Sequence, residues 1–333
     1  MDAELSGSAP PPSSAEAPLV TILLATRNGS RFLPEALRGI DAQTYRPLEL
    51  VAVDDGSTDS TGEILRAFAA ERPWVRLLRA EGAGPAGARA VAFDAARGSL
   101  IAIHDDDDWS RPERIARQVA YLAAHPAVGV VGSAAEIIDE RGAVLAPYRV
   151  PIVEREIRRV LRRAPPFVHG SVLMRREAYE AAGGFRAPFR CAEDYDLWAR
   201  IPTRFALANL SEPLYRWRLH GANSFTRDRV RHIEYLALAR AFAAERAQRG
   251  ADSIERLAAA ASDLDGFRRG YRLGARLALF RGEGYIREGR TGEGRRALGP
   301  AFLDPRTVAS ALAWWVVSWP VEGSPRGRRY RDR

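Results

Sequence analysis

The hydrophobic positions between Leu19 and His104 form short, continuous apolar runs that alternate with amphipathic segments. The runs predict buried strands at Leu19–Ala25, Leu48–Asp54, Val75–Arg79 and Ser99–His104. The segments between them predict helices at Phe32–Ala42, from Ser60 to about Ala70, and at Ala86–Ala96. Because strands alternate with helices, we expect an α/β fold with a mostly parallel sheet covered on both faces.

Two tetrapeptides have the form of a helix-start signal, in which a hydroxyl residue precedes an acidic residue by three positions. They are Ser60-Thr61-Gly62-Glu63 and Ser110-Arg111-Pro112-Glu113, and the second predicts a helix to about His125. Beyond Val128 the pattern is less regular. It predicts strands at Val128–Ile138 and Phe167–Met174 and helices at Glu154–Arg163 and Arg176–Ala182.

The rest of the chain divides by composition. Residues 1–18 are rich in Pro, Ser and Ala, and we expect them to be disordered. Residues 19–225 would form the α/β domain. From residue 226 to the end, Arg- and Ala-rich amphipathic segments predict a helical appendage, with the domain boundary near Ser224–Arg229.

The net charge is +8, and every basic residue is Arg because the chain contains no Lys. No basic run with interleaved aromatic residues is present, so we expect no nucleic-acid partner. The single cysteine, Cys191, excludes a disulfide framework and a cysteine-based zinc site. A reducing, cytoplasmic compartment is the simplest setting.

Neither end of the chain predicts a membrane span. The N-terminus lacks the basic and apolar regions of a signal peptide. The longest apolar stretch, Val308–Trp319, is shorter than the ~20 residues that a spanning helix needs. Its three tryptophans and the arginines after it leave three alternatives open: peripheral contact with the inner face of the membrane, docking on the α/β domain, or a homodimer contact.

Three polar clusters follow the predicted strands directly. They are Thr26-Arg27-Asn28, Asp54-Asp55-Gly56-Ser57 and Asp105–Asp108. Ligands of parallel sheets bind beyond the carboxyl ends of the strands. The sequence therefore predicts one ligand site built from these three clusters.

The run Asp105–Asp108 carries the sharpest chemical signal. Adjacent carboxylates repel one another, and this repulsion raises their pKa values unless a cation compensates it. Mg²⁺ and Mn²⁺ prefer oxygen ligands and often share them with substrate phosphates. The alternative is a solvated acidic loop at the start of the next helix. Since the run follows a buried strand, we favour a divalent metal site.

The other acidic pairs each allow two interpretations. Asp54 and Asp55 could bind a base or ribose, or could simply form a turn and cap a helix. Glu193 and Asp194 begin a short helical segment, where Asp194 could act as a general base or belong to a surface acidic pair favoured by the helix dipole.

Two histidines are also candidates. His220 follows an apolar, strand-like run and could ligate a metal or contact phosphate, and His169 is a second candidate of the same kind. A lone histidine is more often a structural hydrogen-bonding group.

A glycine pattern suggests a different ligand. Gly82–Gly87 matches G-x-G-x-x-G, as in dinucleotide-binding proteins, and acidic residues follow about 20 positions later. However, the strand before it is short and carries Arg76 and Arg79. That fingerprint belongs to the first strand of a domain, whereas this is the third, so we do not expect a nicotinamide cofactor.

Taken together, five segments resemble the inverting glycosyltransferases of family 2, which have the GT-A fold. The segments are VTILLATRNGSRFLPEAL, LELVAVDDGSTDST, GPAGARAVAFDAARGSLIAIHDDDDW, CAEDYDLWAR and YRWRLHGANS, and they span about Val20 to Ser224. Ala90, Ala92 and His104 depart from the family pattern and affect details of donor contact.

The resemblance implies a metal-dependent, inverting transfer of a sugar from a nucleoside-diphosphate sugar, most simply a UDP-sugar. The acceptor would be a carbohydrate or lipid-linked hydroxyl in cell-surface polysaccharide or glycolipid synthesis. By position, the donor site would contain Thr26, Arg27, Asn28, Asp54, Asp55, Arg89, Asp105 and Asp106. The metal (Mn²⁺ or Mg²⁺) would bind Asp107, Asp105 and His220. Asp194 would be the catalytic base, and the acceptor side would include His169, Gly170, Ser171 and Glu193.

Two other functions remain open from the sequence. A sugar-nucleotide nucleotidyltransferase would use a similar sheet, but Thr26-Arg27-Asn28-Gly29 is a poor version of its glycine-rich basic loop. An inactive carbohydrate-binding module would be expected to lose the acidic positions, and all of them are present.

Overall fold

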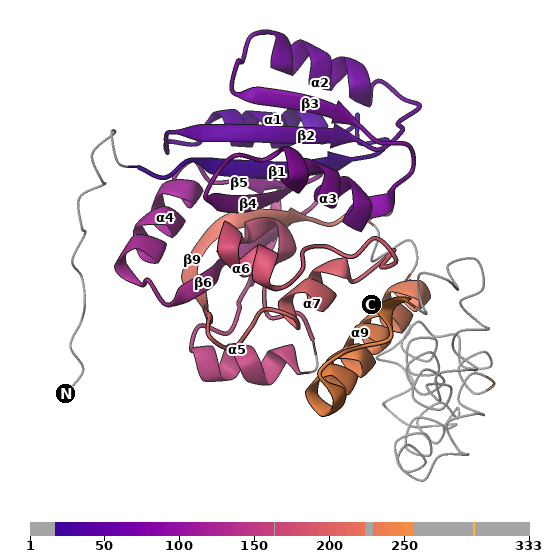
Figure 1. Ribbon diagram of the computed structural model, residues 1–333. Helices are drawn as coiled ribbons and strands as arrows, with labels where there is room; N and C mark the ends of the chain where they lie inside the picture. The colour runs from indigo at the N-terminus through magenta and orange to yellow at the C-terminus, as the bar shows by residue number, and fades with distance from the viewer. Residues whose placement is uncertain (1–16, 163, 224–228, 256–295, 297–333) are drawn as a thin grey trace, which may run out of the picture. The chain divides into compact units, whose positions relative to one another are not determined.

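The computed structural model describes residues 17–162, 164–223, 229–255 and 296 (Figure 1). The chain divides into two compact units, 1–220 and 221–333. The first unit contains the sheet and all the predicted site residues. The second contains one described long helix, α9 (Arg229–Arg249).

The first unit is built on a single mixed sheet. Among the described residues it has nine strands, in the order β3-β2-β1-β4-β8-β6-β9-β5, with β7 paired to β6. Their bounds are β1 Val20–Thr26, β2 Leu48–Asp54, β3 Val75–Arg79, β4 Leu100–Asp105, β5 Trp109–Ser110, β6 Val128–Ile138, β7 Val144–Tyr148, β8 Leu173–Arg175 and β9 Ala206–Arg218.

The first four strands are parallel and confirm the predicted half of the sheet. Alternate residues of β1 and β2 point to opposite faces, and both faces are apolar because helices cover both. Leu23 and Val51 lie in one core cluster with α3 (Gly84–Ala95), whereas Ile22 and Leu50 lie in the other with α1 (Leu33–Asp41).

The remaining helices complete the two layers, as Figure 1 shows. Buried residues of α2 (Thr61–Ala70) and α4 (Arg114–Ala124) join the layer of α1. Buried residues of α5 (Glu154–Leu161), α6 (Arg176–Ala181) and α7 (Glu193–Trp198) join the layer of α3. This arrangement confirms the α/β class and the helix-covered sheet.

The second half of the sheet differs from the sequence prediction. Strands β5 and β7 were not predicted, and β9 was anticipated only as the strand-like run before His220; the partners of β5 and β9 are distant in sequence. The helix predicted to begin at Ser110 begins at Arg114 instead. Ser110 pairs with Tyr215 of β9, so the apparent helix-start signal is part of a strand.

The predicted strand at Phe167–Met174 is also interrupted. A 3₁₀ turn, η1 (His169–Ser171), precedes β8, which alone pairs with β4 and β6. The Ser171 hydroxyl donates to the Val168 carbonyl at 2.8 Å and closes the turn. Side-chain hydrogen bonding to the local backbone therefore outweighs the apolar pattern here.

Several predictions fall outside the described residues. They are the disordered N-terminus over residues 1–16, the interfacial segment Val308–Trp319, and the helical appendage beyond residue 255 apart from residue 296. The three-part domain division stays a prediction. Within the described part of the chain, no helix has both the length and the apolar character needed to cross a membrane.

Candidate functional site

The three predicted polar clusters lie at one edge of the sheet. Strand β1 lies between β2 and β4, with Thr26 opposite Asp54 and Ala25 opposite Asp105. The Asp55 amide donates to the Thr26 carbonyl at 2.9 Å. The structure therefore brings the strand-end residues together, as the parallel topology predicts.

Each aspartate of the acidic loop, Asp105–Asp108, contacts a different partner. Asp105 accepts a hydrogen bond from Arg89 at 2.7 Å, and Asp106 accepts one from the Thr26 hydroxyl. Asp107 lies 2.9 Å from the His220 ring, and Asp108 accepts the Arg218 amide at 2.8 Å. Burial, reinforced by the neighbouring Asp107, raises the pKa of Asp106 to about 7.

A buried polar layer supports this loop. The Tyr215 hydroxyl accepts the Asp105 amide at 3.2 Å, and the fully buried Arg114 lies over the Tyr215 ring at 5.4 Å. Burial lowers the pKa of His104 to about 3, so this histidine is neutral at physiological pH. Sequence analysis missed Tyr215 and Arg114, because their role depends on β9, which was not predicted.

Arg89 connects the acidic loop to α7. It is buried on α3, and its two terminal nitrogens donate to Asp105 at 2.7 Å and to Glu193 at 2.6 Å. Burial alone would raise the pKa of Asp105, but His169 and Arg89 outweigh it and hold that pKa below its ordinary value. Arg89, which the resemblance placed in the donor site, thus connects the acidic loop to the start of α7.

Asp194 lies at the start of α7, with 17 % of its side chain exposed. Ala192, just before the helix, has a positive φ of 52°, which turns the chain sharply into it. Two residues further along α7, the fully buried Asp196 accepts hydrogen bonds from Arg186 at 2.8 Å and Arg200 at 2.9 Å. These contacts fix the helix that carries Asp194.

His169 lies between the acidic loop and Asp194. One ring nitrogen is 4.0 Å from Asp105 and the other is 4.0 Å from Asp194. Among the described residues, neither ring nitrogen has a hydrogen-bond partner, although both are buried. The imidazole therefore keeps its hydrogen-bonding capacity for a group that enters the site.

Gly170 and Ser171, predicted on the acceptor side, have tight local environments. A Cβ at position 170 would overlap the Tyr215 hydroxyl and lie 3.0 Å from Asp105. The Ser171 side chain is fully buried and accepts the Ser133 amide at 3.1 Å. The absence of a side chain at Gly170 thus lets the Tyr215 hydroxyl lie against the backbone of the turn, and the hydrogen bonds of the buried Ser171 hydroxyl stabilise the turn.

On the donor side, Asp55 caps the glycine-rich turn. Its two carboxylate oxygens accept the amides of Ala83 at 2.6 Å and Gly84 at 2.8 Å, at the N-terminus of α3. In dinucleotide-binding proteins a pyrophosphate takes that place. Because Asp55 fills it, the glycine fingerprint is explained without a nicotinamide cofactor.

The neighbouring residues Asn28 and Arg27 frame the same side. Asn28 adopts a positive φ of 56°, and its side chain accepts the Thr58 amide at 2.8 Å. The buried Asp54 accepts the Ser57 amide at 2.9 Å. The structure therefore brings these predicted donor-site residues to one loop cluster.

Asp107 and His220 form the best-matched pair for a divalent cation. Their 2.9 Å separation is close to the ~3 Å between adjacent ligands of an octahedral ion bound at ~2.1 Å. The described residues contain no group of three His, Cys, Asp or Glu side chains arranged to hold a metal. A substrate diphosphate and waters would supply the remaining ligands, as is usual for such ions.

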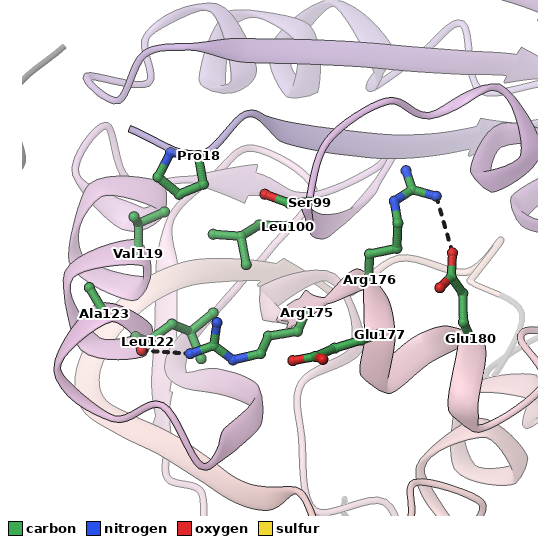
Figure 2. Close-up of a pocket in the computed structure, with 10 residues that line it drawn as sticks. All are labelled: Pro18, Ser99, Leu100, Val119, Leu122, Ala123, Arg175, Arg176, Glu177 and Glu180. Atoms are coloured by element: carbon green, nitrogen blue, oxygen red, sulfur yellow. Dashed lines mark hydrogen bonds and ion pairs between the residues drawn. The ribbon is translucent and has the colours of Figure 1, made fainter. Parts of the chain in front are cut away.

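A separate pocket of about 500 Å³ lies at the opposite edge of the sheet (Figure 2). Pro18 and Ser99, which line it, precede β1 and β4. Arg175 in its wall donates to the Leu122 carbonyl at 2.8 Å, and Arg176 lies near Glu180. None of the predicted site residues lines it, so it is not the candidate site.

Comparison with known proteins identifies the family. Residues 21–183 match Glycosyl transferase family 2. EpsE of Bacillus subtilis, named as a glycosyltransferase, is 34% identical over 206 residues, which are 60% of this chain and 73% of EpsE. The chain belongs to glycosyltransferase family 2. The amylovoran biosynthesis glycosyltransferase AmsE of Erwinia amylovora is 29% identical over 60% of this chain and 75% of its own length.

Two solved structures of other proteins are similar to this chain and share its GT-A fold. S. aureus TarS in complex with UDP-GlcNAc has a TM-score of 0.58 at 15% identity, covering 94% of this chain and 91% of that chain. The mannosyltransferase PcManGT of Pyrobaculum calidifontis, with GDP-Man and Mn²⁺, has a TM-score of 0.54 at 23% identity, covering 97% and 81%. Family membership also excludes the nucleotidyltransferase alternative for this chain.

Proposed function

We propose that this glycosyltransferase transfers a sugar, with inversion, from a nucleoside-diphosphate sugar to an acceptor hydroxyl, with Asp194 as the base. An inverting displacement needs the leaving group and the attacking hydroxyl on opposite sides of the anomeric carbon. The enzyme must therefore hold a leaving-group site and a base at a fixed separation.

The observation that carries this proposal is the double connection between the acidic loop and α7. Arg89 bridges Asp105 and Glu193 through a buried pair of ion contacts. His169 spans Asp105 and Asp194 at 4.0 Å on each side. Arg89 thus ties the acidic loop to α7, and His169 lies between that loop and the predicted base.

The proton path follows from the same geometry. Asp194 is partly exposed, so an acceptor hydroxyl can reach its carboxylate. As that hydroxyl attacks, Asp194 accepts its proton, a role that contributes ~10²–10⁴-fold to the rate. A nitrogen of His169 is placed to hydrogen-bond the acceptor and orient it toward Asp194.

A divalent metal fits the donor side. Asp107 and His220 would hold it, with Asp105 on the same loop, and Mn²⁺ or Mg²⁺ would neutralise charge on the nucleoside-diphosphate leaving group. The structures of TarS and PcManGT with UDP-GlcNAc and with GDP-Man and Mn²⁺ support a nucleotide-sugar donor and a metal. The relatives in polysaccharide biosynthesis support a carbohydrate or lipid-linked acceptor.

The donor and metal are tested by nucleoside-diphosphate release. The protein is incubated with a panel of UDP- and GDP-sugars, with Mn²⁺ or Mg²⁺, or with EDTA. We expect release with one nucleotide family, lost in EDTA and restored by added metal. For Asp107→Ala, we expect metal-dependent donor binding in calorimetry to disappear. Release that is insensitive to EDTA would contradict the metal assignment.

Stereochemistry is tested separately on the product. Proton NMR of the first-formed glycoside should show the anomeric configuration opposite to that of the donor. A retained configuration would exclude a single displacement, and with it the role of Asp194 as the base of that step.

A further inference from the structure

One segment of the first unit exposes an unusual amount of apolar surface. Seven large hydrophobic side chains are exposed among the described residues, and five of them lie in the ten residues from Val144 to Val153. The five are Val144, Leu145, Tyr148, Ile152 and Val153. Scattered exposed apolar residues are ordinary, but a concentration of this kind indicates a contact surface.

This segment, which we call the apolar strap, is held firmly by the rest of the fold. Tyr148 packs edge-on against Trp217 at 5.7 Å, and Val150 joins the buried cluster of Ala135, Val168 and Tyr215. The Pro151 carbonyl accepts a hydrogen bond from Asn209 at 2.8 Å. The exposed side chains therefore project from an anchored segment.

The turn that precedes the strap is also well ordered. The Asp139 carboxylate accepts the amides of Arg141 at 2.9 Å and Ala143 at 2.8 Å. Arg218 donates to the carbonyls of Asp139 and Glu140, each at 3.2 Å, and also to the Asp107 carbonyl. One buried arginine thus connects the base of this hairpin to the acidic loop.

Two features of the strap oppose pairing with another strand. Pro147 lies within β7 and lacks an amide hydrogen, and the register between β6 and β7 shifts at Ile137/Ile138. Proline and bulges are the usual means by which an edge strand resists edge-to-edge association. A second copy of the chain bound through β7 is therefore disfavoured.

The charges of the strap favour an anionic surface. Between residues 140 and 162 the exposed charged residues are five arginines (Arg141, Arg149, Arg155, Arg159 and Arg162) and three glutamates (Glu140, Glu154 and Glu156), and Glu140 pairs with Arg31 at 2.6 Å. Glu154 already pairs with Arg158 at 2.9 Å. Exposed apolar side chains interspersed with arginines are the composition that inserts shallowly at an anionic lipid headgroup region.

We propose that the apolar strap is a docking surface for an anionic lipid membrane. The side chains of Val144, Leu145 and Val153 enter the headgroup boundary, and Arg149 and Arg155 contact lipid phosphates. This contact holds the enzyme at a membrane surface through the described α/β unit, independently of whether sugar transfer follows the scheme above.

Sedimentation with lipid vesicles tests the proposal on the full chain. We expect binding to vesicles of phosphatidylcholine with phosphatidylglycerol, and weaker binding to phosphatidylcholine alone. Val144→Asp/Leu145→Asp should lower the partition coefficient by about tenfold or more, because it removes apolar contacts and adds negative charge. Arg149→Ser/Arg155→Ser should lower it by about fivefold per arginine, and only with the anionic vesicles.

Two further variants separate docking from folding. Val153 is 62 % exposed and occupies the N-cap of α5, where Asp is a preferred residue. Val153→Asp should therefore leave thermal stability equal or higher while weakening vesicle binding. Val91→Asp, a matched change of an exposed valine on α3, should leave binding unchanged.

The results of these measurements distinguish membrane docking from contacts between copies of the chain. Vesicle binding that is absent, or unaffected by both the Val144→Asp/Leu145→Asp and Val153→Asp changes, would overturn the proposal. A wild-type dimer that becomes monomeric in these variants, without a change in vesicle binding, would assign the strap to contacts between copies instead. Nucleoside-diphosphate release with a soluble acceptor, measured in parallel, reports on the transfer proposal alone.

Discussion

The donor side and the acceptor side of the candidate site are built in different ways. The predicted donor side consists of the ends of β2, β1 and β4, which are neighbouring parallel strands in the sheet, so its loops lie next to each other. The predicted acceptor side comprises the turn η1, which Tyr215 of β9 approaches closely, and helix α7, which Arg186 and Arg200 hold through Asp196. Regular topology places the donor residues, whereas the acceptor residues depend on contacts between distant segments.

A buried bridge joins the two sides, and an exposed bridge joins the loop after β1 to the β6–β7 turn. Arg89 is buried and binds Asp105 and Glu193, whereas Arg31 is 65 % exposed and binds Glu140 on the β6–β7 turn. Buried ion pairs become costly when one partner is removed, but exposed pairs contribute little. The comparison therefore predicts that the two bridges contribute very differently to the free energy of unfolding.

The largest effect is expected from breaking the buried bridge. Arg89→Met leaves Asp105 and Glu193 buried without their cation, and we expect a loss of about 3–5 kcal/mol in the free energy of unfolding. Urea unfolding measures this loss. Arg89→Lys keeps one charge but cannot reach both carboxylates in a fork, so it should fall between the wild type and Arg89→Met. A loss below about 1 kcal/mol would mean that the two sides are held together by other contacts.

The next effect concerns the close approach at Gly170. Gly170→Ala places a Cβ against the Tyr215 hydroxyl, and overpacking of this kind costs about 1–3 kcal/mol. We expect the midpoint of urea unfolding to fall accordingly. Tyr215→Phe removes the clashing oxygen, so the double variant should recover part of the loss relative to the sum of the two single changes. Strict additivity would show that the two positions do not interact.

A pH-dependent effect is expected at Glu49, which lies in the parallel half at the edge away from the site. Burial alone would raise the pKa of Glu49, but hydrogen bonds from Thr21 and Arg97 outweigh it and hold that pKa below its ordinary value of 4.5. A lowered carboxyl pKa stabilises the folded state above the unfolded-state value, and the stabilisation is lost as pH falls through the folded-state value.

Glu49→Gln should therefore cost about 2 kcal/mol near neutral pH, a typical figure for hydrogen bonds to a buried charge. The difference between wild type and variant should shrink as the pH is lowered below about 4.5, as followed by urea unfolding at a series of pH values. A difference that stays constant down to strong acid would show that the carboxylate charge is not the stabilising factor.

The smallest effect is expected from the exposed bridge. Arg31→Met removes the 2.6 Å ion pair with Glu140, and we expect a change of no more than about 1 kcal/mol in unfolding free energy. The same measurement at high salt should show a smaller difference still, because exposed pairs are screened. A loss as large as that of Arg89→Met would erase the distinction between the two bridges.

The contrast between the two sides also explains what the sequence could predict. The four parallel strands, the helices between them and the acidic strand ends follow from apolar periodicity and from one rule about parallel sheets. Asp105–Asp107, Thr26 and Asp55 were predicted on that basis and lie at one edge. For Asp194 and His220 the residues alone left two interpretations open, and the family resemblance favoured the catalytic base and the metal ligand.

The remaining parts depend on tertiary contacts that no local pattern carries. Ser110 mimics a helix start but pairs with β9, and the bridge that Arg89, a predicted donor-site residue, makes between two carboxylates was not predicted. Tyr215 and Arg114 were missed because they lie about 100 residues apart, on β9 and α4, and meet only in the folded core, where the guanidinium lies over the tyrosine ring. Long-range polar contacts of this kind were not predictable from periodicity.

Turnover and donor binding of Asp194→Asn test the central claim most directly. If Asp194 accepts the acceptor proton and the acidic loop binds the donor, turnover should fall by about 10²–10⁴-fold or more. Calorimetric binding of the donor nucleotide sugar with Mn²⁺ should remain within a few-fold of wild type. Near-wild-type turnover, or a loss of donor binding as large as the loss of turnover, would contradict this division of roles.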